Sequence, residues 1–319
     1  MIAVVIPYYQ REAGILRKAL ASVAAQRDCP MPLHVIVVDD SSPAPAADEL
    51  RASSAPGVDV QLVRQANAGP GAARNAGLDH VPAGTRYVAF LDSDDEWSAD
   101  HLARAVVALE SGFDFYFADL YQLEQSVGAF ARAGRIQPAE HGAIAGAPGL
   151  HAYQGDMFDQ ILRGNVIGTP TVVYRYERFS TIRFRSDLTS AGEDYLFWMT
   201  LARAGVRIAF SSQIETRCGR GVNVYAGAKW ASDEYFVRLR NELSFRKMTA
   251  RLFEVDDTQR RHLRTGIGAL RRSFAGSLLH RVRRREPVPA ALLKAHWQLD
   301  PMSFAAIPAT GARLLLGRA

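Results

Sequence analysis

The first part of the chain alternates short, continuously apolar segments with segments of helical periodicity. We predict strands in the apolar segments "IAVVIPY" from Ile2, "LHVIVVDDSS" from Leu33, "VDVQLVRQ" from Val58 and "YVAFLD" from Tyr87. We predict helices in "ILRKALASVAAQ" from Ile15 and from about Ser98 to Ser111. Because continuous apolar strands with helical crossovers are buried on both faces, this pattern predicts an α/β fold with a mostly parallel sheet flanked by helices.

The pattern becomes less regular after these elements. From "FDFYFADLYQ" through "HGAIAGAPG" we expect an insertion or a loop. "GTPTVVYR" predicts a further strand, and "GEDYLFWMTLARAG" predicts a helix that ends at Gly205. From about Trp230 the pattern is helical and rich in arginine. We therefore predict a sheet-containing domain over residues 1–228 and a helical C-terminal region over residues 229–319.

Composition narrows the class of protein. The chain has 319 residues, of which 48% are hydrophobic and 22% charged, and this is typical of a globular protein. Cys29 and Cys218 stand far apart without metal-binding spacing, which argues against a disulfide framework or a zinc site. We expect a cytoplasmic protein, because "MIAVVIPYYQR" lacks the basic start of a signal peptide and no run of about 18 apolar residues occurs.

Acidic residues follow the strand at Tyr87 directly, in "RYVAFLDSDDEW". If the chain stays extended, Asp92 and Asp94 point to one side and Ser93 points away. Ligands bind at the carboxyl ends of parallel strands, and oxygen ligands in small number suit Mg²⁺ or Mn²⁺ shared with substrate phosphates. The alternative is a solvated acidic turn that caps the helix near Ser98.

The segment "NAGPGAARNAG" lies between the third strand and a helix. Gly69 and Gly71 imitate a dinucleotide fingerprint, but Arg74 occupies the third glycine position and the segment follows the third strand instead of the first. An arginine at a helix start beside glycines suits contact with a nucleotide base or phosphate. The alternative is that Arg74 only pairs with a neighbouring acidic residue.

Five segments, taken in order, resemble the family 2 glycosyltransferases of the GT-A fold, which are inverting enzymes that use nucleotide sugars. They are "VVIPYYQRE", "VIVVDDSS", "NAGPGAARNAG", "YVAFLDSDDEW" and "GEDYLFW", within residues 1–225. The resemblance implies a Rossmann-like catalytic domain and a divalent metal, Mn²⁺ or Mg²⁺. It also implies a nucleotide-sugar donor, which we expect to be a UDP-sugar such as UDP-glucose.

The resemblance also implies roles for individual residues. Pro7 and Tyr9 line the nucleotide pocket, Asp40 with Asp39 beside it and Arg74 hold the base, usually uracil, and Asn67, Gly71 and Ser93 belong to matching donor-binding motifs. Asp92 and Asp94 form the DxD motif, with Asp94 as the metal ligand, and Asp194 is the catalytic base. An acidic residue at this place can also simply complement the dipole of the helix that follows it.

Two later regions bear on ligands and partners. In "ETRCGRGVNVYAG" the family commonly has a loop, often with a histidine, that closes over the diphosphate. This segment contains no histidine. Arg217 or Arg220 could supply the positive charge for the diphosphate instead, and the alternative is that both arginines are solvated. "GRGVN" is also similar to glucosyltransferases of the succinoglycan type, which build repeat units on a lipid carrier. The implied acceptor is a glycan or a lipid-linked saccharide of cell-surface polysaccharide synthesis.

An apolar stripe recurs at steps of three and four near the C-terminus, beside many arginines. It consists of Leu263, Ile267, Leu270, Phe274, Leu278 and Val282. A basic amphipathic helix can lie on an anionic membrane, which would make the protein peripheral, but the stripe can equally pack on other parts of the chain. Nucleic acid is a poorer partner, because no nucleic-acid-binding signature accompanies the charge.

Two other classes of protein remain open. A sugar-phosphate nucleotidyltransferase would carry a glycine-rich loop with Arg or Lys directly after the first strand, where this chain has "PYYQREAG". A non-catalytic nucleotide- or carbohydrate-binding module would have a broken acidic set, whereas Asp40, Asp92, Asp94 and Asp194 are all present.

Overall fold

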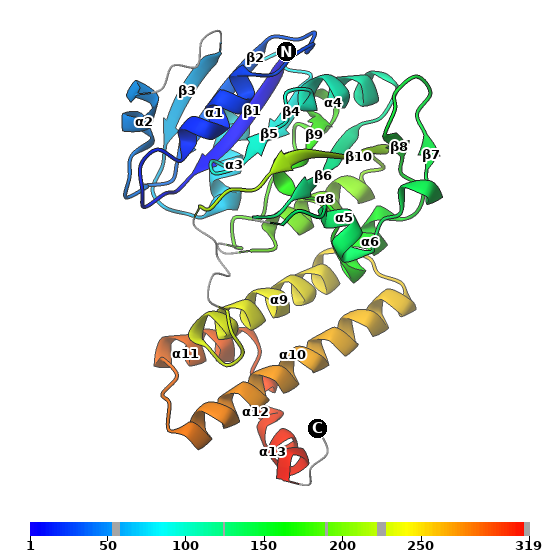
Figure 1. Ribbon diagram of the computed structural model, residues 1–319. Helices are drawn as coiled ribbons and strands as arrows, with labels where there is room; N and C mark the ends of the chain where they lie inside the picture. Colours follow the sequence, from blue (N-terminus) through cyan, green and yellow to red (C-terminus); the bar gives the residue numbers. More distant parts are fainter. Residues whose placement is uncertain (53–57, 124, 189–190, 222–227, 316–319) are drawn as a thin grey trace. The chain divides into compact units, whose positions relative to one another are not determined.

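The computed structural model describes residues 1–52, 58–123, 125–188, 191–221 and 228–315. The chain divides into two compact units, one of residues 1–189 with 193–222 and the other of residues 190–192 with 223–319. The first is built on a sheet flanked by helices, and the described part of the second is helical (Figure 1). The predicted α/β class with C-terminal helices is therefore confirmed.

Within the described residues, ten strands form one sheet in the order β3-β2-β1-β4-β9-β6-β10-β8-β7, with β5 paired to β10. The strands are β1 (Ile2–Tyr8), β2 (Leu33–Asp39), β3 (Asp59–Arg64), β4 (Tyr87–Phe90), β5 (Glu96–Trp97), β6 (Phe115–Tyr121), β7 (Gly142–Ala143), β8 (Leu150–Ala152), β9 (Val173–Arg175) and β10 (Ile208–Arg217). β1 to β4 are parallel, as predicted, and so are β6 and β10. β9 runs antiparallel between β4 and β6, so the longer strands all share one direction.

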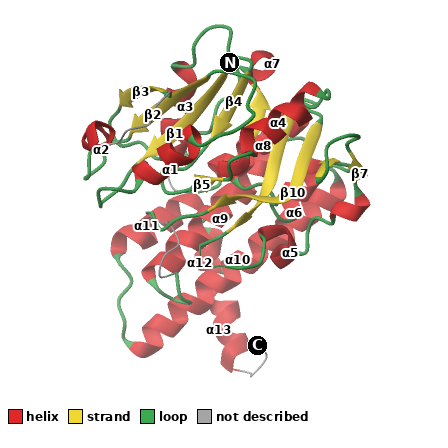
Figure 2. Ribbon diagram, turned by 45° about the horizontal axis from the view of Figure 1, so that its top comes forward, coloured by secondary structure: helices red, strands yellow, loops and turns green. Residues whose placement is uncertain are grey.

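Helices cover both faces of this sheet (Figure 2). They are α1 (Leu16–Ala24), α2 (Ala46–Ala52), α3 (Pro70–Asp79), α4 (His101–Glu110), α5 (Ala129–Ala133), α6 (Met157–Arg163), α7 (Tyr176–Phe179) and α8 (Glu193–Arg203). Alternate β1 residues such as Val4 pack with α1 and α4. Val5 faces the other way, toward Gly77 of α3, where a Cβ would lie only 2.4 Å from Val5 Cγ1. Phe90, the neighbour of Val5 in the sheet, packs against Phe197 and Trp198 of α8.

Two features of the sheet differ from the sequence prediction. The segment expected to be an insertion or loop begins with β6, which lies between β9 and β10 inside the sheet. Only beyond β6 does the chain break into short elements: α5, the 3₁₀ turn η1 (Pro138–Glu140), β7, β8 and α6. "GTPTVVYR" begins as the 3₁₀ turn η2 (Thr169–Thr171) before it becomes β9. The turn η2 is relevant to function because Thr169 within it contacts Asp194 of the candidate site.

The second unit contains α9 (Asp233–Leu252), α10 (Asp257–Arg284), α11 (Ala290–Leu299), α12 (Met302–Ala305) and α13 (Ile307–Leu315). Much of the predicted apolar stripe of α10 is internal. Phe274 is fully buried and forms a core with Phe236 and Leu239 of α9, and Leu270 and Leu278 pack against it. The stripe therefore packs mainly within its own unit and is not a free membrane-binding face, although Val282 at its end is 67% exposed. Among the described residues, no helix combines the length and apolar character needed to cross a bilayer.

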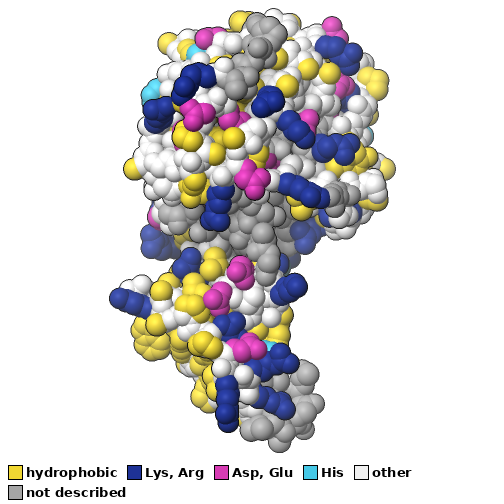
Figure 3. All heavy atoms as spheres, turned by 60° about the vertical axis from the view of Figure 1, so that its left-hand side comes forward, with side chains coloured by type: hydrophobic (Ala, Val, Ile, Leu, Met, Phe, Trp, Pro, Cys, Tyr) yellow, Lys and Arg dark blue, Asp and Glu magenta, His cyan; other side chains and the backbone are white. Residues whose placement is uncertain are grey.

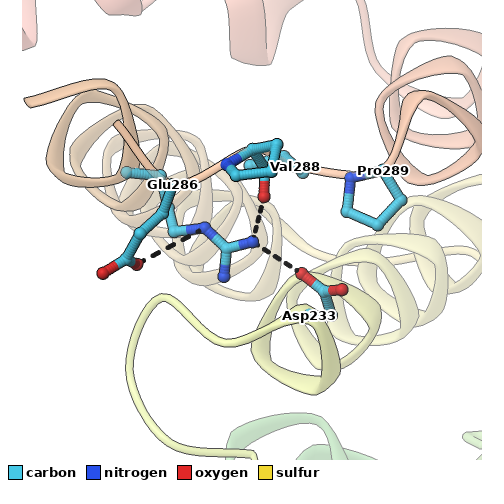
Figure 4. Close-up of a pocket in the computed structure, with 6 residues that line it drawn as sticks. Asp233, Glu286, Val288 and Pro289 are labelled. Carbon is cyan, nitrogen blue, oxygen red and sulfur yellow. Dashed lines mark hydrogen bonds and ion pairs between the residues drawn. The ribbon is translucent and has the colours of Figure 1, made fainter. Parts of the chain in front are cut away.

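Ion pairs join the helices of this second unit. Arg271 of α10 donates to both carboxylate oxygens of Asp300, at 2.7 and 2.8 Å, and these bonds hold the pKa of Asp300 below its usual range against the effect of burial. Arg281 donates to Asp233 Oδ1 at 3.0 Å and to the Pro287 carbonyl, and these contacts line a pocket of about 530 Å³ (Figure 4). The bonded arginine ties the start of α9 to the end of α10, so we interpret this pocket as structural.

Candidate active site

The motifs singled out in the sequence lie at one edge of the sheet, where the parallel strands end. The turn after β4 carries the acidic motif, and β10 ends beside it through its pairing with β5. The start of α3 and the start of α8 also reach this edge, because Arg74 of α3 contacts both Asp92 and Glu193. Ligands of open parallel sheets bind at this end of the strands.

The acidic motif forms a turn and not an extension of β4. Asp95 N donates to the Asp92 carbonyl at 3.0 Å, so the expectation that Asp92 and Asp94 share one side of an extended strand was wrong. Asp92 Oδ1 accepts from Arg74 Nη2 at 2.8 Å, Asp94 Oδ2 from Gly221 N at 2.7 Å, and Asp95 Oδ1 from Gly219 N at 2.9 Å. The three carboxylates thus each bind a different partner.

Negative charge is concentrated in this turn. Burial raises the pKa of Asp94, and the charge of Asp92 raises it further. Burial likewise raises the pKa of Asp95, with added repulsion from Asp92 and Asp94. Among the described residues, no group of three His, Cys, Asp or Glu side chains is arranged to hold a metal ion. The turn nevertheless offers hard oxygen donors whose ionisation a cation would favour.

A glycine-containing segment after β10 lies directly on the acidic turn. A Cβ on Gly219 would lie 1.8 Å from the Asp94 carbonyl oxygen, and one on Gly221 would lie 2.6 Å from Asp94 Cγ. Only glycine lets the two backbones approach this closely. Backbone N–H groups of this segment donate to the carboxylates of Asp94 and Asp95, and the sequence analysis did not predict these partners.

The two arginines of that prediction lie around this segment. Arg217, the last residue of β10, is exposed, and its guanidinium lies 5.3 Å from the ring centre of Tyr121. Arg220 is exposed as well. Residues 222–227 of the expected loop lie outside the described residues. A role for either arginine in binding a diphosphate stays a prediction.

Arg74 is buried between two acids and is not free at the helix start. Its Nη2 donates to Asp92, and its Nη1 donates to Glu193 Oε1 at 2.9 Å. Burial disfavours its charge, but Asp92, Glu193 and Asp194 outweigh burial and raise its pKa. Gly71 permits this packing, since a Cβ there would lie 3.0 Å from Glu193 Cγ. Arg74 thus links the acidic turn to the start of α8.

Glu193 and Asp194 are the first two residues of α8. Burial and the charge of Asp194 together raise the pKa of Glu193 to about 7, against the opposing influence of Arg74. The second oxygen of Glu193 is buried, and none of the described residues donates a hydrogen bond to it. Burial also raises the pKa of Asp194, against the influence of Arg74 and of two hydrogen bonds. A carboxylate with a raised pKa is suited to accept a proton near neutral pH.

Those two hydrogen bonds fix the Asp194 carboxylate. Its Oδ1 accepts from Tyr195 N at 2.9 Å, and its Oδ2 accepts from Thr169 Oγ1 at 3.1 Å. Thr169 was missed by the sequence analysis because η2 has no periodicity and a single threonine carries no signal. Asp194, which the sequence analysis selected, lies at the edge of the sheet where the parallel strands end. Its role as a catalytic base stays a prediction.

The residues expected to hold a base bind the protein itself. Asp39 accepts from the backbone N–H groups of Ser42 and Ala46, at the start of α2. Asp40 accepts from Gln65 Nε2 and from the N–H groups of Ala68 and Gly69, and its carbonyl accepts from Asn67 Nδ2. Both carboxylates therefore shape the loops after β2 and β3. Their contact with a nucleotide stays a prediction.

Pro7, Tyr9 and Ser93 lie around the end of β1. Pro7 is in β1 and Tyr9 directly follows it, and both are partly buried. Ser93 is buried and its Oγ accepts from Gln10 Nε2 at 3.1 Å. Gln10, which the sequence analysis did not single out, thus joins the end of β1 to the acidic turn.

Comparison with known proteins agrees with this arrangement. The chain matches the family model "Glycosyl transferase family 2" over residues 3–181. It is 37% identical over 229 residues to the succinoglycan biosynthesis protein ExoW of Rhizobium meliloti (strain 1021), and the match covers 70% of each protein.

Solved structures show the same fold at low sequence identity. S. aureus TarS 1-349 in complex with UDP-GlcNAc matches with a TM-score of 0.54 at 16% identity, over 99% of this chain and 92% of that one. Mannosyltransferase PcManGT from Pyrobaculum calidifontis, in complex with GDP-Man and Mn²⁺, matches with a TM-score of 0.54 at 17% identity, over 100% and 88%. The predicted GT-A fold is confirmed, and the chain belongs to glycosyl transferase family 2.

Proposed function

We propose that this glycosyltransferase is an inverting enzyme that transfers a hexosyl group from a UDP-sugar to a hydroxyl of a glycan or lipid-linked saccharide during the synthesis of a cell-surface polysaccharide. The observation that carries the proposal is Asp194, a carboxylate of raised pKa held in place next to the Arg74–Asp92 pair. The name of ExoW supports the polysaccharide, and the UDP-GlcNAc complex of TarS supports a uridine donor.

In this proposal the acceptor hydroxyl attacks the anomeric carbon, and its proton passes to Asp194. The bond between that carbon and the donor phosphate oxygen breaks, and the electron pair leaves with the nucleoside diphosphate. A positioned general base contributes typically 10²- to 10⁴-fold to the rate. Glu193 is the first alternative base, because it lies beside Asp194 and its pKa is about 7.

A divalent cation, Mn²⁺ or Mg²⁺, fits the acidic turn. Asp95 is buried and Asp94 is partly buried, and burial together with repulsion from neighbouring carboxylates raises the pKa of both. A cation would favour their ionised forms. Asp94 would hold it, with Asp92 beside it, and diphosphate oxygens would complete a site that protein ligands alone do not fill. The cation would stabilise the negative charge that develops on the leaving diphosphate.

We also propose that the C-terminal unit contacts the anionic inner face of a membrane, which makes the cytoplasmic enzyme peripheral. Hydrophobic side chains gather on one face of this unit, with Lys and Arg side chains near its margins (Figure 3). Trp297 and Met302 are 54% and 56% exposed, and Arg283 to Arg285 are exposed at the end of α10. Tryptophan beside basic residues is typical of membrane interfaces.

A donor screen tests the nucleotide proposal. Thermal unfolding is measured with UDP, GDP and dTDP, each with and without Mn²⁺, and UDP with Mn²⁺ should raise the melting temperature most because ligand binding stabilises the folded state. Equal stabilisation by GDP would contradict the uridine assignment of Asp40 and Arg74. Release of UDP from UDP-sugars incubated with extracts separates an enzyme from a binding module. It also separates a glycosyltransferase from a nucleotidyltransferase, which would need pyrophosphate and would form UTP and a sugar phosphate instead of UDP.

A further inference from the structure

The turn η2 is held rigidly next to Asp194. Thr171 N and Thr171 Oγ1 both donate to the Gly168 carbonyl, at 2.9 and 2.8 Å. A Cβ on Gly168 would lie 2.2 Å from Leu120 Cδ2 in β6, so the backbone of the turn lies directly against the sheet. Thr169, which lies between these anchors, is buried with 6% of its surface exposed. Its hydroxyl therefore has few orientations open to it.

The same turn is bonded to the two elements that flank the acidic turn. The Pro170 carbonyl accepts from Trp97 Nε1 of β5 at 2.5 Å and from Thr216 Oγ1 of β10 at 3.4 Å. Trp97 closes the acidic motif, and Thr216 precedes the segment whose N–H groups bind Asp94 and Asp95. Thr169 and Pro170 thus connect the acidic turn to Asp194 through three hydrogen bonds.

We propose that Thr169 is a positioning residue for the transfer reaction, whose hydroxyl orients the Asp194 carboxylate toward the acceptor. An ionised carboxylate has about four acceptor positions, and Thr169 and Tyr195 N occupy two of them, which leaves room for the acceptor hydroxyl. The proposal rests on Asp194 being the base.

The Thr169 bond also acts on the protonation of Asp194. A hydroxyl that donates to a carboxylate favours its ionised form. The other charged groups that act on Asp194 are Arg74, which favours ionisation, and Asp92 and Glu193, which oppose it. Removal of the Thr169 hydroxyl leaves these three charged groups in place. A change in the pH profile of the variant can therefore be assigned to the lost hydrogen bond.

The test compares Thr169→Val, which removes the donor at nearly constant volume, with Thr169→Ser, which keeps it. For Thr169→Val we expect kcat to fall by about 10- to 100-fold, as for loss of a hydrogen bond to a charged group, with the donor KM unchanged. The acidic limb of the pH profile should move to higher pH, because the ionised carboxylate loses a hydrogen-bond donor. Thr169→Ser should restore kcat to within about threefold of the parent and return the limb to its original position. Thr169→Ala replaces the valine variant should valine prevent folding.

Controls separate the possible failures. Thr171→Val breaks a bond of the same turn without touching Asp194, so it should lower stability and leave the acidic limb in place. The proposal is overturned if Thr169→Val has a near-normal kcat and an unshifted acidic limb of the pH profile. It is also overturned if Thr169→Ser loses as much kcat as Thr169→Val does. If Asp194→Asn binds UDP and Mn²⁺ nearly normally but is inactive in the same assay, the base assignment stands whatever the result for Thr169; if it retains turnover, the base assignment fails first.

Discussion

Glu193 is a buried carboxylate whose ionisation opposes folding, and Glu193→Gln measures that opposition. Arg74 Nη1 donates to one oxygen at 2.9 Å, while the other oxygen is buried and has no partner within the part of the chain that the structure describes. Burial first, and then the charge of Asp194, raise the pKa to about 7 from an ordinary value of 4.5. Between these two values the folded chain binds the proton more strongly than the unfolded chain does, so stability falls as the pH rises from about 4.5 to 7.

The magnitude follows from the shift in pKa. One unit corresponds to about 1.4 kcal/mol, so ionised Glu193 costs on the order of 3 kcal/mol at pH 8 relative to a group with an ordinary pKa. Breaking a buried ion pair costs about 3–5 kcal/mol when a charge is left unpaired. Here Arg74 keeps Asp92, and the Gln carbonyl can still accept from Arg74 Nη1. We therefore expect Glu193→Gln to be more stable than the parent at pH 8, by up to about 3 kcal/mol, and nearly equal to it at pH 5.

Urea unfolding at pH 5 and pH 8 measures the difference. Trp230 and Trp297 are replaced by Phe in every variant, so that fluorescence of Trp97 and Trp198 reports on the first unit. Glu49→Gln is the matched control, because Glu49 is a buried carboxylate that accepts three hydrogen bonds, and its loss should destabilise at both pH values. A Glu193→Gln variant that is less stable than the parent at pH 8 would show that the Arg74 pair outweighs burial, and would refute the reasoning.

Two further predictions concern the acidic turn and the C-terminal unit. Asp94→Ala should abolish both transfer and the Mn²⁺-dependent part of UDP binding in titration calorimetry, whereas Asp194→Asn should bind UDP and Mn²⁺ nearly normally; Mn²⁺-dependent UDP binding in Asp94→Ala would contradict the metal assignment. The full chain should sediment with anionic phospholipid vesicles less as salt rises, and Trp297→Ser with Met302→Ser should weaken sedimentation at constant charge. A chain that ignores such vesicles at low salt has no membrane contact of this kind.

The hydrophobic pattern predicted β1 to β4 and β9, and it missed β6 and β10. β1, β2 and β4 are continuous apolar runs, which parallel strands buried on both faces require. β10 was not predicted, since Ser211 and Glu215 interrupt its apolar pattern. Both are buried: Arg104 donates to both of them, and Tyr116 to Glu215. The residue type does not show whether a polar side chain is hydrogen-bonded inside the fold or exposed to solvent. Periodicity alone therefore does not distinguish a buried strand with polar residues from an exposed segment.

The sequence predicted the part of the candidate site that consists of side chains in recognisable motifs, but not the part that consists of backbone groups. Acidic residues and Arg74 were found from their motifs, but the partners of Asp94 and Asp95 are the N–H groups of Gly221 and Gly219, which no side-chain pattern encodes. The apolar stripe of α10 raised a similar difficulty. Amphipathic spacing shows that a face is covered without showing by what, and only tertiary packing shows that α9 and α11 help to cover it.

The buried carboxylates of the first unit differ in how completely they are satisfied, and this difference marks the site. Glu215 accepts from Arg104 and Tyr116 and contacts His101, and Glu49 accepts from Tyr8, Gly14 and Leu16. Glu193, by contrast, has one oxygen that receives no hydrogen bond from any described residue, and repulsion adds to burial in raising its pKa.

An under-satisfied buried carboxylate lowers stability, so folding alone does not account for its presence. Placing Glu193 and Asp194 in the first turn of α8 reduces this cost, because the helix N-terminus favours negative charge, yet both pKa values are still raised. Arg74 joins the acidic turn to the start of α8, and carboxylates with raised pKa values lie in both places. A cation would favour the charge of the acidic turn, and an acceptor hydroxyl would donate to a carboxylate of α8, so we expect the donor and the acceptor to bind there together.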